Sequence, residues 1–267
     1  MLTPQAIRNK LDRPAPGPVE VLETVTSTNT LLKERAQNGA EAGTVLIALE
    51  QTAGRGRRGR SFLSSPGQGL YMSMLLRPGL AAEQLMPLTG LAAVAAAEAA
   101  EAVSGAQVGV KWVNDLILNG KKLGGILTEL GTTPGEETPW AVIGIGVNTG
   151  FTAAELDAAG LTDIATSFSN EGLCVPPEAL AAALIGAFSD MEAALKAGTV
   201  DRYLSSYRAR CVTLHRPVKI LYPAGAREGT ALDIDDAFGL RVLRTDDGTE
   251  DTVFSGEVSV RGFYGYI

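Results

Sequence analysis

Residues 108–130 read VGVKWVNDLILNGKKLGGILTEL, and this stretch indicates the fold. Two apolar runs, DLILN and LGGILTEL, lie on either side of Asn119-Gly120. An Asn-Gly pair between two such runs is a strong signal for a β-hairpin. VGVKW before the hairpin and WAVIGIGVN at 140–148 after it also have the composition of strands. The middle of the chain is therefore predicted to form a sheet of several strands.

Helices and further strands are predicted on both sides of this stretch, which indicates an α/β or α+β fold. Residues 1–18 form an N-terminal arm and a proline-rich linker, and Ser27 to Asn29 make a helix N-cap cluster before a run that stops at Gly39. The predicted helices lie at 3–12, 30–38, 85–103, 177–196 and 200–210, and the other strands at 19–25, 44–50 and 70–77.

The pattern changes after Cys211. From there the chain gives only short strand-like runs, PVKIL, GTALDID, GLRVLRT and DTVFSGEVSV, at a spacing of roughly ten residues with turns between them. This spacing is typical of a small β-barrel or sandwich. We therefore divide the chain near residue 213, into a first domain at 1–213 and a small β domain at 214–267.

The composition is that of a protein with a full hydrophobic core: 267 residues, 45% apolar and 20% charged. The net charge of −7 argues against a dedicated nucleic-acid coat or a polybasic membrane binder. No apolar run approaches the length of a membrane span, and the N-terminus lacks the features of a signal peptide. The two cysteines, Cys174 and Cys211, form no spacing pattern. They indicate a reduced, cytosolic setting and exclude a disulfide scaffold or a zinc finger.

Residues 54–60, GRGRRGR, follow a predicted strand and formally fit the dinucleotide fingerprint G-x-G-x-x-G. We reject that interpretation because loop sequence follows where the fingerprint needs a helix, and no acidic residue lies about 20 positions further on. Four guanidinium groups on a glycine-rich backbone are instead suited to binding a carboxylate or a phosphate. The plain alternative is a solvated basic turn or a weak nucleic-acid patch.

Four other motifs are ambiguous when each is taken alone. KWVND at 111–115 has two interpretations. It either places functional polar side chains at the end of a strand, or it contains a surface ion pair between Lys111 and Asp115 with Trp112 in the core. Lys122 lies just before Gly124 and Gly125. Because glycine has no side chain, the Lys122 side chain can approach a group that lies close to the backbone there. Asn148 ends a strand in the run GIGVN, and the residues at 27–29 are most simply a helix N-cap.

In combination, these motifs resemble the catalytic region of bacterial biotin protein ligases. Five motifs occur in the order of that family: STN at 27–29, QTAGRGRRGR at 51–60, KWVND at 111–115, KKLGGILTE at 121–129 and GIGVN at 144–148. RPVKI at 216–220 and SGEVSVRG at 255–262 extend the resemblance over nearly the whole chain. The sequence departs from the family at Val113, where proline is usual, and at Phe62, where tryptophan is common.

The resemblance implies a mixed sheet with helices, a C-terminal SH3-like barrel, and a ligase that uses ATP. Such an enzyme converts biotin to biotinyl-5′-AMP and then passes biotin to a lysine of a biotin carboxyl carrier protein. Neither step needs a covalent enzyme intermediate. The sequence agrees with this, since its only histidine, His215, is interpreted as structural and neither cysteine has a base partner. ATP, Mg²⁺ and biotin are the expected cofactors and substrates, with no dedicated metal site.

The resemblance also assigns roles to residues. It implies catalytic roles for Arg57, Lys111, Asp115 and Lys122. It places biotin against Ser27, Thr28, Asn29, Gln51, Arg55, Gly56, Arg57 and Lys122. It places ATP or the adenylate against Arg55, Arg57, Arg58, Arg60, Lys111, Asn114 and Asn148. Asp115 either orients and deprotonates the incoming lysine or helps to hold Mg²⁺.

Two rival functions remain at this point. A lipoate–protein ligase has the same fold and adenylation logic, but an apolar lipoyl tail does not need the polar residues at 27–29 and Gln51. A nucleic-acid-binding module is opposed by the net charge and by the lack of aromatic residues interleaved with basic ones. Only 26 residues precede Ser27, so we expect no winged-helix repressor domain.

The remaining expectations concern surroundings and motion. We expect a cytoplasmic protein without nucleic-acid or membrane partners, with a homodimer left open. We also expect residues 54–67 to become ordered when biotin and ATP neutralise the arginines and the loop covers the adenylate.

Overall fold

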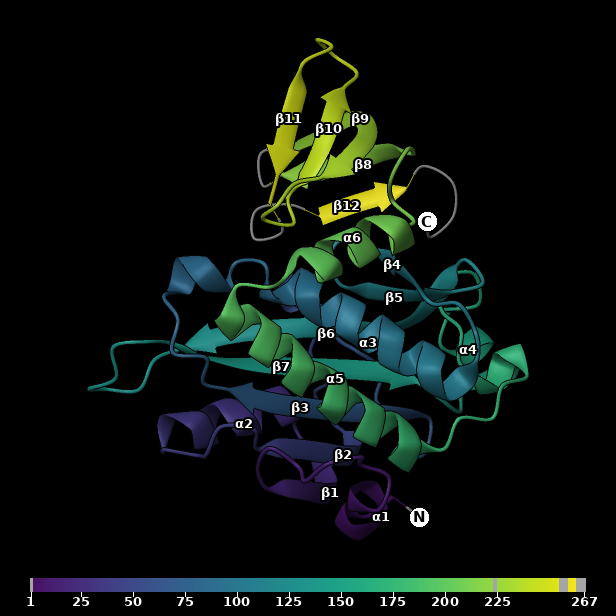
Figure 1. Cartoon of the computed structure of the whole chain (residues 1–267). Helices are drawn as coiled ribbons and strands as arrows, with labels where there is room; N and C mark the ends of the chain where they lie inside the picture. The colour runs from purple at the N-terminus through teal and green to yellow at the C-terminus, as the bar shows by residue number, and fades with distance from the viewer. Residues whose placement is uncertain (1, 223–224, 255–258, 263–267) are drawn as a thin grey trace.

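The computed structural model describes residues 2–222, 225–254 and 259–262, with the backbone alone for the last four. Figure 1 shows a seven-stranded sheet with helices and, at one end of it, a smaller sheet. The strand order of the large sheet is β1-β2-β3-β7-β6-β5-β4, and only β1 and β2 pair in parallel. Its strands are β1 Val19–Val25, β2 Val45–Gln51, β3 Gly69–Leu76, β4 Gly109–Lys111, β5 Asp115–Leu118, β6 Lys121–Gly131 and β7 Trp140–Asn148. The prediction of a mixed α/β fold is confirmed.

Strand residues alternate between two cores on opposite faces of this sheet. Ile143 and Ile145 of β7 belong to the large core under α3 (Leu88–Ser104) and α5 (Pro177–Ala197), which cross the front of the sheet in Figure 1. Val142 belongs to a smaller core under α2 (Thr28–Gln37). The second face is thus only partly covered by a helix, and it is the face that carries the site described below.

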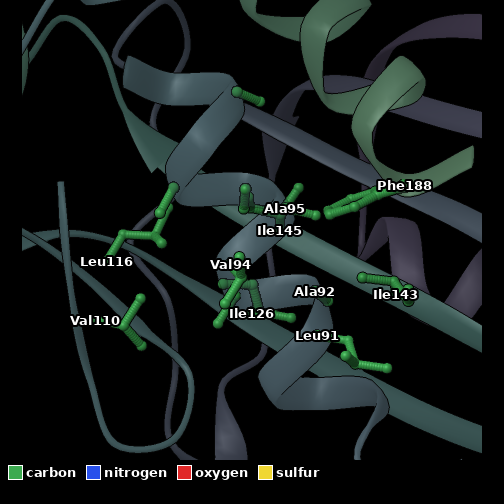
Figure 2. Close-up of a cluster of buried hydrophobic side chains, with 14 of the residues drawn as sticks. Leu91, Ala92, Val94, Ala95, Val110, Leu116, Ile126, Ile143, Ile145 and Phe188 are labelled. Carbon is green, nitrogen blue, oxygen red and sulfur yellow. The ribbon is translucent and has the colours of Figure 1, made fainter. Parts of the chain in front are cut away.

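The alanine-rich helix α3 lies close against the sheet. Figure 2 shows Leu91, Val94 and Ala95 of α3 among Ile126, Ile143 and Ile145 of the strands, with Phe188 of α5 beside them. The helical stretch 82–104 is long and apolar enough to cross a membrane, which corrects the expectation that no segment is. In the structure 61% of its apolar window is buried inside the protein, as in a core helix.

The C-terminal sheet is antiparallel, with the order β11-β10-β9-β8-β12. Helix α6 (Asp201–Arg210) precedes it, and its strands are β8 Pro217–Tyr222, β9 Gly225–Ile234, β10 Leu240–Arg244, β11 Glu250–Val253 and β12 Ser259–Gly262. Among the residues that the structure describes, no pairing joins β11 to β12. The predicted small β domain is confirmed as an antiparallel sheet. Its described residues do not form the closed barrel that the resemblance implies. Part of the motif quoted at 255–262 and of the run DTVFSGEVSV, residues 255–258, lies outside the described residues.

Three elements differ from the sequence prediction. Helix α1 covers only Pro4–Arg8 rather than 3–12, with Thr3 as its N-cap. Helix α3 begins after Pro87, and the residues before it form a 3₁₀ turn at Ala82–Leu85. Helix α4 (Ala153–Ala158) was not predicted, although Thr152 and Glu155 make the capping box that signals such a helix.

Candidate active site

A polar pocket opens on the α2 face of the large sheet. The N-terminal end of α2, the end of β2, the loop after it and the centres of β6 and β7 surround the pocket. It is lined by Ser27, Thr28, Asn29, Gln51, Arg55, Phe62, Gly125, Leu127, Gly144, Ile145 and Gly146. The structure therefore brings together five of the residues predicted to bind biotin, from segments that the sequence separates.

Glycines on β7 form the floor of this pocket. A methyl group on Gly144 would overlap the Asn29 carboxamide, and one on Gly146 would overlap the ring of Phe62. Because side chains alternate along β7, positions 144 and 146 lie on the same face of the sheet. The two glycines therefore leave space on that face for Asn29 and Phe62. Phe62 supplies an aromatic face at the position where the family commonly has tryptophan.

Hydrogen bonds fix the polar side chains on one side of the pocket. The side chain of Gln51 accepts from the backbone N–H of Thr28 at 2.8 Å and donates from Nε2 to Ser64 Oγ at 3.0 Å. The fully buried Ser73 Oγ lies 2.7 Å from Thr28 Oγ1 and 2.6 Å from Asn29 Oδ1. The residues at 27–29 thus cap α2, since Ser27 Oγ accepts from the Thr30 N–H, and also line the pocket.

Glu129 of β6 lies behind Asn29 and holds two cations. Its carboxylate accepts from Asn29 Nδ2 at 3.0 Å, from Lys33 Nζ at 2.7 Å and from Arg55 at 3.1 Å. Burial alone would raise the pKa of Glu129, but the hydrogen bonds from Lys33 and Asn29 and the charges of Lys33 and Arg55 outweigh it and lower that pKa. Glu129 is therefore a stable anion at neutral pH.

The arginine–glycine loop runs from Gly54 across the mouth of the site to β3. It contains one 3₁₀ turn, at Arg57–Gly59, and then returns to extended chain, which confirms the rejection of the dinucleotide fingerprint. Arg57 donates to Asn114 Oδ1 at 3.0 Å, and burial lowers the pKa of its guanidinium while the Asp115 charge opposes that shift. Arg58 donates to the Leu221 carbonyl of β8, and Arg60 is exposed.

The KWVND segment and the lysine–glycine motif meet beside Arg57. Lys122 Nζ forms an ion pair with Asp115 Oδ1 at 2.7 Å. A methyl group on Gly125 would lie 3.1 Å from Asp115 Oδ1 and 3.3 Å from Lys122 Nζ, so the bare backbone there lets this pair lie flat on the strand. Lys111 is buried and faces Asp115 in the β4–β5 register. The simple alternative placed Lys111 in an ion pair at the surface, and the burial of Lys111 contradicts that surface position.

The other predicted residues lie at the edges of this arrangement. Asn114 Nδ2 donates to the Ile126 carbonyl at 2.8 Å, which holds the KWVND turn to β6. Gly56 donates its N–H to Arg60 O and so closes the loop turn. Asn148 is buried, and its Nδ2 donates to the Thr166 carbonyl at 2.9 Å, so its described contact joins β7 to the chain after α4. A nucleotide contact for Asn148 stays a prediction.

Two polar residues of the site were not predicted. Ser73 is a small polar residue among the buried residues of β3, and Glu129 closes the motif KKLGGILTE. A polar side chain within an otherwise apolar strand was the available signal in both cases. In the part of the chain that the structure describes, no cluster of three or more His, Cys, Asp or Glu residues could hold a metal ion.

This geometry fits one kind of chemistry. Arg55 lines a pocket with fixed hydrogen-bonding groups, Lys122 lies beside its lining residue Gly125, and Arg57 is held by Asn114 of the neighbouring turn. Such an arrangement binds a partly polar ring at one end and brings anionic groups together at the other. Nothing in it supplies a Ser–His–Asp set, since the only histidine, His215, is exposed at the start of the C-terminal sheet.

Comparison with known proteins agrees with this geometry. Residues 21–148 match the model of the biotin/lipoate A/B protein ligase family, and residues 213–261 match that of the biotin protein ligase C terminal domain. The chain is 33% identical over 257 residues to the bifunctional ligase/repressor BirA of Bacillus subtilis, covering 89% of this chain and 72% of that protein. It is 33% identical over 226 residues to the biotin--[acetyl-CoA-carboxylase] ligase of Mycobacterium tuberculosis, covering 82% and 80%.

The fold has a solved counterpart as well. The biotin protein ligase from Aquifex aeolicus, in complex with biotin and ATP, superposes with a TM-score of 0.74 at 27% identity, covering 92% of this chain and 99% of that one. The two family matches cover residues of both sheets, and the second is described as the C terminal domain of biotin protein ligases. The chain belongs to the biotin protein ligase family.

Proposed function

We propose that the protein activates biotin with ATP and transfers it to a lysine of a biotin carboxyl carrier protein. The observation that carries the proposal is the pocket itself. Fixed polar groups from α2 and β2 lie at one end, and Arg57 and Lys122 lie beside the other. The relatives that bind biotin and ATP, or that are named for biotin and acetyl-CoA carboxylase, support the same substrates.

The first step joins two anions. An oxygen of the biotin carboxylate attacks the α-phosphorus of ATP, the bond from that phosphorus to the β-phosphate oxygen breaks, and pyrophosphate leaves. Arg57 and Lys122 offset the repulsion between carboxylate and triphosphate and stabilise the charge that develops on the α-phosphate. Their hydrogen bonds to Asn114 and Asp115 hold both cations in place before the substrates arrive.

If ATP binds together with Mg²⁺, a carboxylate of the site would help to hold the ion. Asp115 is the carboxylate beside Arg57 and Lys122, so it is the residue that would complete that coordination. The bound ion would neutralise phosphate charge. Lys111, buried opposite Asp115 in the strand register, adds positive charge to the same edge.

In the second step the ε-amine of the carrier lysine attacks the acyl carbon of biotinyl-5′-AMP. The acyl–oxygen bond to the phosphate breaks, AMP leaves, and the nitrogen loses a proton. As the alternative to holding Mg²⁺, Asp115 would orient the amine and accept that proton. The step therefore needs no nucleophile from the enzyme.

The pocket favours biotin over lipoate. A ureido ring offers one carbonyl acceptor and two N–H donors, and it is complementary to Gln51 and Asn29, whereas a dithiolane ring leaves both unsatisfied. Incubating the protein with ATP and each acid, followed by mass spectrometry of the products, tests the choice. Biotinyl-5′-AMP is expected, and a lipoyl adenylate in its place would contradict the proposal.

The proposal extends to the setting of the reaction. We propose a cytoplasmic enzyme whose macromolecular partner is the carrier domain, and we keep residue 213 as the domain division, supported by the family match at 213–261. The net charge of −7 favours neither nucleic acid nor an anionic membrane as a partner. Filter binding of DNA that increases at low salt would contradict this part of the proposal. The proposal leaves the number of subunits open.

A further inference from the structure

The carboxylate of Glu129 contacts three groups that belong to two different parts of the site. Asn29 and Lys33 come from successive turns of α2, and Arg55 comes from the arginine–glycine loop. We propose that Glu129 is a positioning residue that orients the Asn29 carboxamide and thereby selects a ligand ring that carries N–H donors. This inference rests on the proposed function, because it concerns recognition of the biotin ring.

The orientation of Asn29 follows from its neighbours. Its Nδ2 group lies 3.1 Å from the carbonyl oxygen of Leu127 and 3.0 Å from Glu129 Oε2. Both neighbours only accept hydrogen bonds, so the NH₂ group must face them and the oxygen must face the other way. Asn29 therefore has both of its donors occupied.

The oxygen of Asn29 faces the pocket. Oδ1 lies over Gly144, where a side chain would overlap it, and it accepts from the Ser73 hydroxyl. A carbonyl oxygen accepts two hydrogen bonds, so one acceptor position on Oδ1 is available to a ligand N–H. Asn29 is only 4% exposed, and a buried acceptor of this kind strongly disfavours a ligand that offers no donor.

Gln51, beside Thr28, supplies a donor to the same pocket. Gln51 Oε1 is occupied by Thr28, and one N–H of its Nε2 is directed to Ser64. The second N–H of Nε2 is then the group that Gln51 offers. A pocket that offers both a donor, from Gln51, and an acceptor, from Asn29, is complementary to a ureido group, which has one carbonyl and two N–H groups.

A glutamine at position 129 would weaken this constraint, because an amide there can turn its own NH₂ toward Asn29 and favour the flipped carboxamide. The Leu127 carbonyl alone would then oppose the flip. Lys33 and Arg55 would lose an anionic partner in such a variant. The change therefore alters the polarity of the pocket without removing volume.

The test uses Glu129→Gln with Glu136→Gln as a matched control. Glu136 also pairs with an arginine, Arg77, in the segment that joins β6 to β7, but it does not line the pocket. Steady-state adenylation is measured with biotin and with the two analogues in which one ring N–H is replaced by oxygen. A second variant, Lys33→Gln, weakens the anchor of Glu129 from the α2 side and serves if Glu129→Gln does not fold.

The wild-type protein and Glu136→Gln are expected to prefer biotin over at least one analogue by about tenfold or more in kcat/KM. In Glu129→Gln the KM for biotin rises about tenfold, kcat changes little, and the preference for biotin over that analogue falls toward one. Lys33→Gln moves the same ratio in the same direction by less. Loss of the Arg55 contact affects biotin and the analogue alike, so the ratio isolates the effect of Asn29.

An unchanged ratio in Glu129→Gln overturns the inference, as does an unchanged ratio in Lys33→Gln if the first variant does not fold. Failure of the proposed function is distinguishable from both results. In that case the wild-type protein makes no biotinyl adenylate at all, whereas here the wild-type protein is active and only its selectivity is in question.

Discussion

The two cations beside the predicted biotin carboxylate are held by neutral or anionic oxygens of the chain itself. Arg57 donates to the Asn114 amide, and Lys122 pairs with Asp115. Because a partly buried cation without a partner is costly, these contacts keep the charges in place when no substrate is bound. The substrate anions then exchange with oxygens of the protein rather than with bulk water, and the cations need little reorganisation.

Arg57→Ala is expected to separate adenylate formation from adenylate retention. Removing this partly buried guanidinium weakens binding of biotinyl-5′-AMP, so activated biotin escapes and labels unrelated lysines. Arg58→Ala should do less, because Arg58 is exposed and its described contact is to the Leu221 carbonyl. Biotinylation of a bystander protein such as serum albumin, probed with streptavidin, gives the comparison. Equal labelling by both variants would contradict the assignment of Arg57 to the adenylate.

The lowered pKa of Glu129 makes a prediction about acid stability. A carboxylate whose folded pKa is depressed contributes stability above its unfolded pKa of about 4.3 and loses it as the pH falls through the folded value. Melting temperatures of wild type and Glu129→Gln should therefore differ most near neutral pH and converge below about pH 4. Glu129 keeps 17% of its side-chain surface exposed. A difference that is constant from pH 7 to pH 3 would contradict this account.

At the residue scale, the two motifs at 27–29 and 51–60 predicted the residues that line the pocket. Ser27, Thr28, Asn29, Gln51 and Arg55 meet in the pocket as expected. Ser73 and Glu129 were not found, because their partners lie 44 and 100 positions away along the chain. Only the register of the sheet brings them together, and one sequence does not contain that register.

At the scale of elements, the patterns of apolar residues and the Asn-Gly turn predicted the strands and the hairpin. Strand β7 has the predicted bounds, and Asn119 and Gly120 both adopt positive φ, at 48° and 80°, as a tight hairpin of this type requires. The predicted bounds of α1 were too long. The short helix α4 was missed because its six residues are too few to show helical periodicity.

The loop at 54–67 is expected to gain order when its anions bind. Its first half is anchored through Arg55 to Glu129 and through Arg57 to Asn114, while the residues at 58–61 are exposed. The charges of Arg58 and Arg60 oppose that of Arg57, so a bound carboxylate and phosphate would reduce the repulsion among these arginines. Closure would shield the mixed anhydride from water.

Hydrogen exchange measures this ordering directly. Backbone amides at 54–67 are followed with and without biotin and a non-hydrolysable ATP analogue, and protection is expected to increase most at 58–61. Residues of β3 provide an internal control, since they are buried and paired in both states. Equal protection of the loop in both states would mean a preformed site, and the closure argument would fail.

At the scale of the whole molecule, one aromatic side chain joins the two sheets. Phe238 belongs to the turn between β9 and β10, and its ring packs edge-on against Tyr207 of α6 with 5.2 Å between centroids. Its carbonyl accepts from Trp112 Nε1 at 2.9 Å, directly beside the segment that carries Asn114. One of the two interpretations of KWVND placed Trp112 in the core, where it lies, but its partner Phe238 is 126 residues away and no local pattern indicates that contact.

Helix α3 makes room for this contact with a glycine. Gly90 lies inside the helix, where glycine costs about 1 kcal/mol relative to alanine. A methyl group at Gly90 would fall within the ring of Phe238. Gly186 of α5 is a matched helix-interior glycine with nothing within 4 Å of the same position. The two glycines therefore separate helix propensity from interdomain packing.

Gly186→Ala is expected to raise the melting temperature by about 2–4 °C, because it gains helix propensity without a clash. Gly90→Ala gains the same propensity, but it must displace a buried aromatic ring, and overpacking typically costs 1–3 kcal/mol. Its melting temperature should fall, and the fluorescence of Trp112 should change as its contact with Phe238 loosens. The double variant Gly90→Ala, Phe238→Leu should recover part of the loss, since the smaller side chain leaves space for the methyl group. If Gly90→Ala instead stabilises the protein as much as Gly186→Ala, the Phe238 ring yields freely, and it cannot be what holds the C-terminal sheet against Trp112.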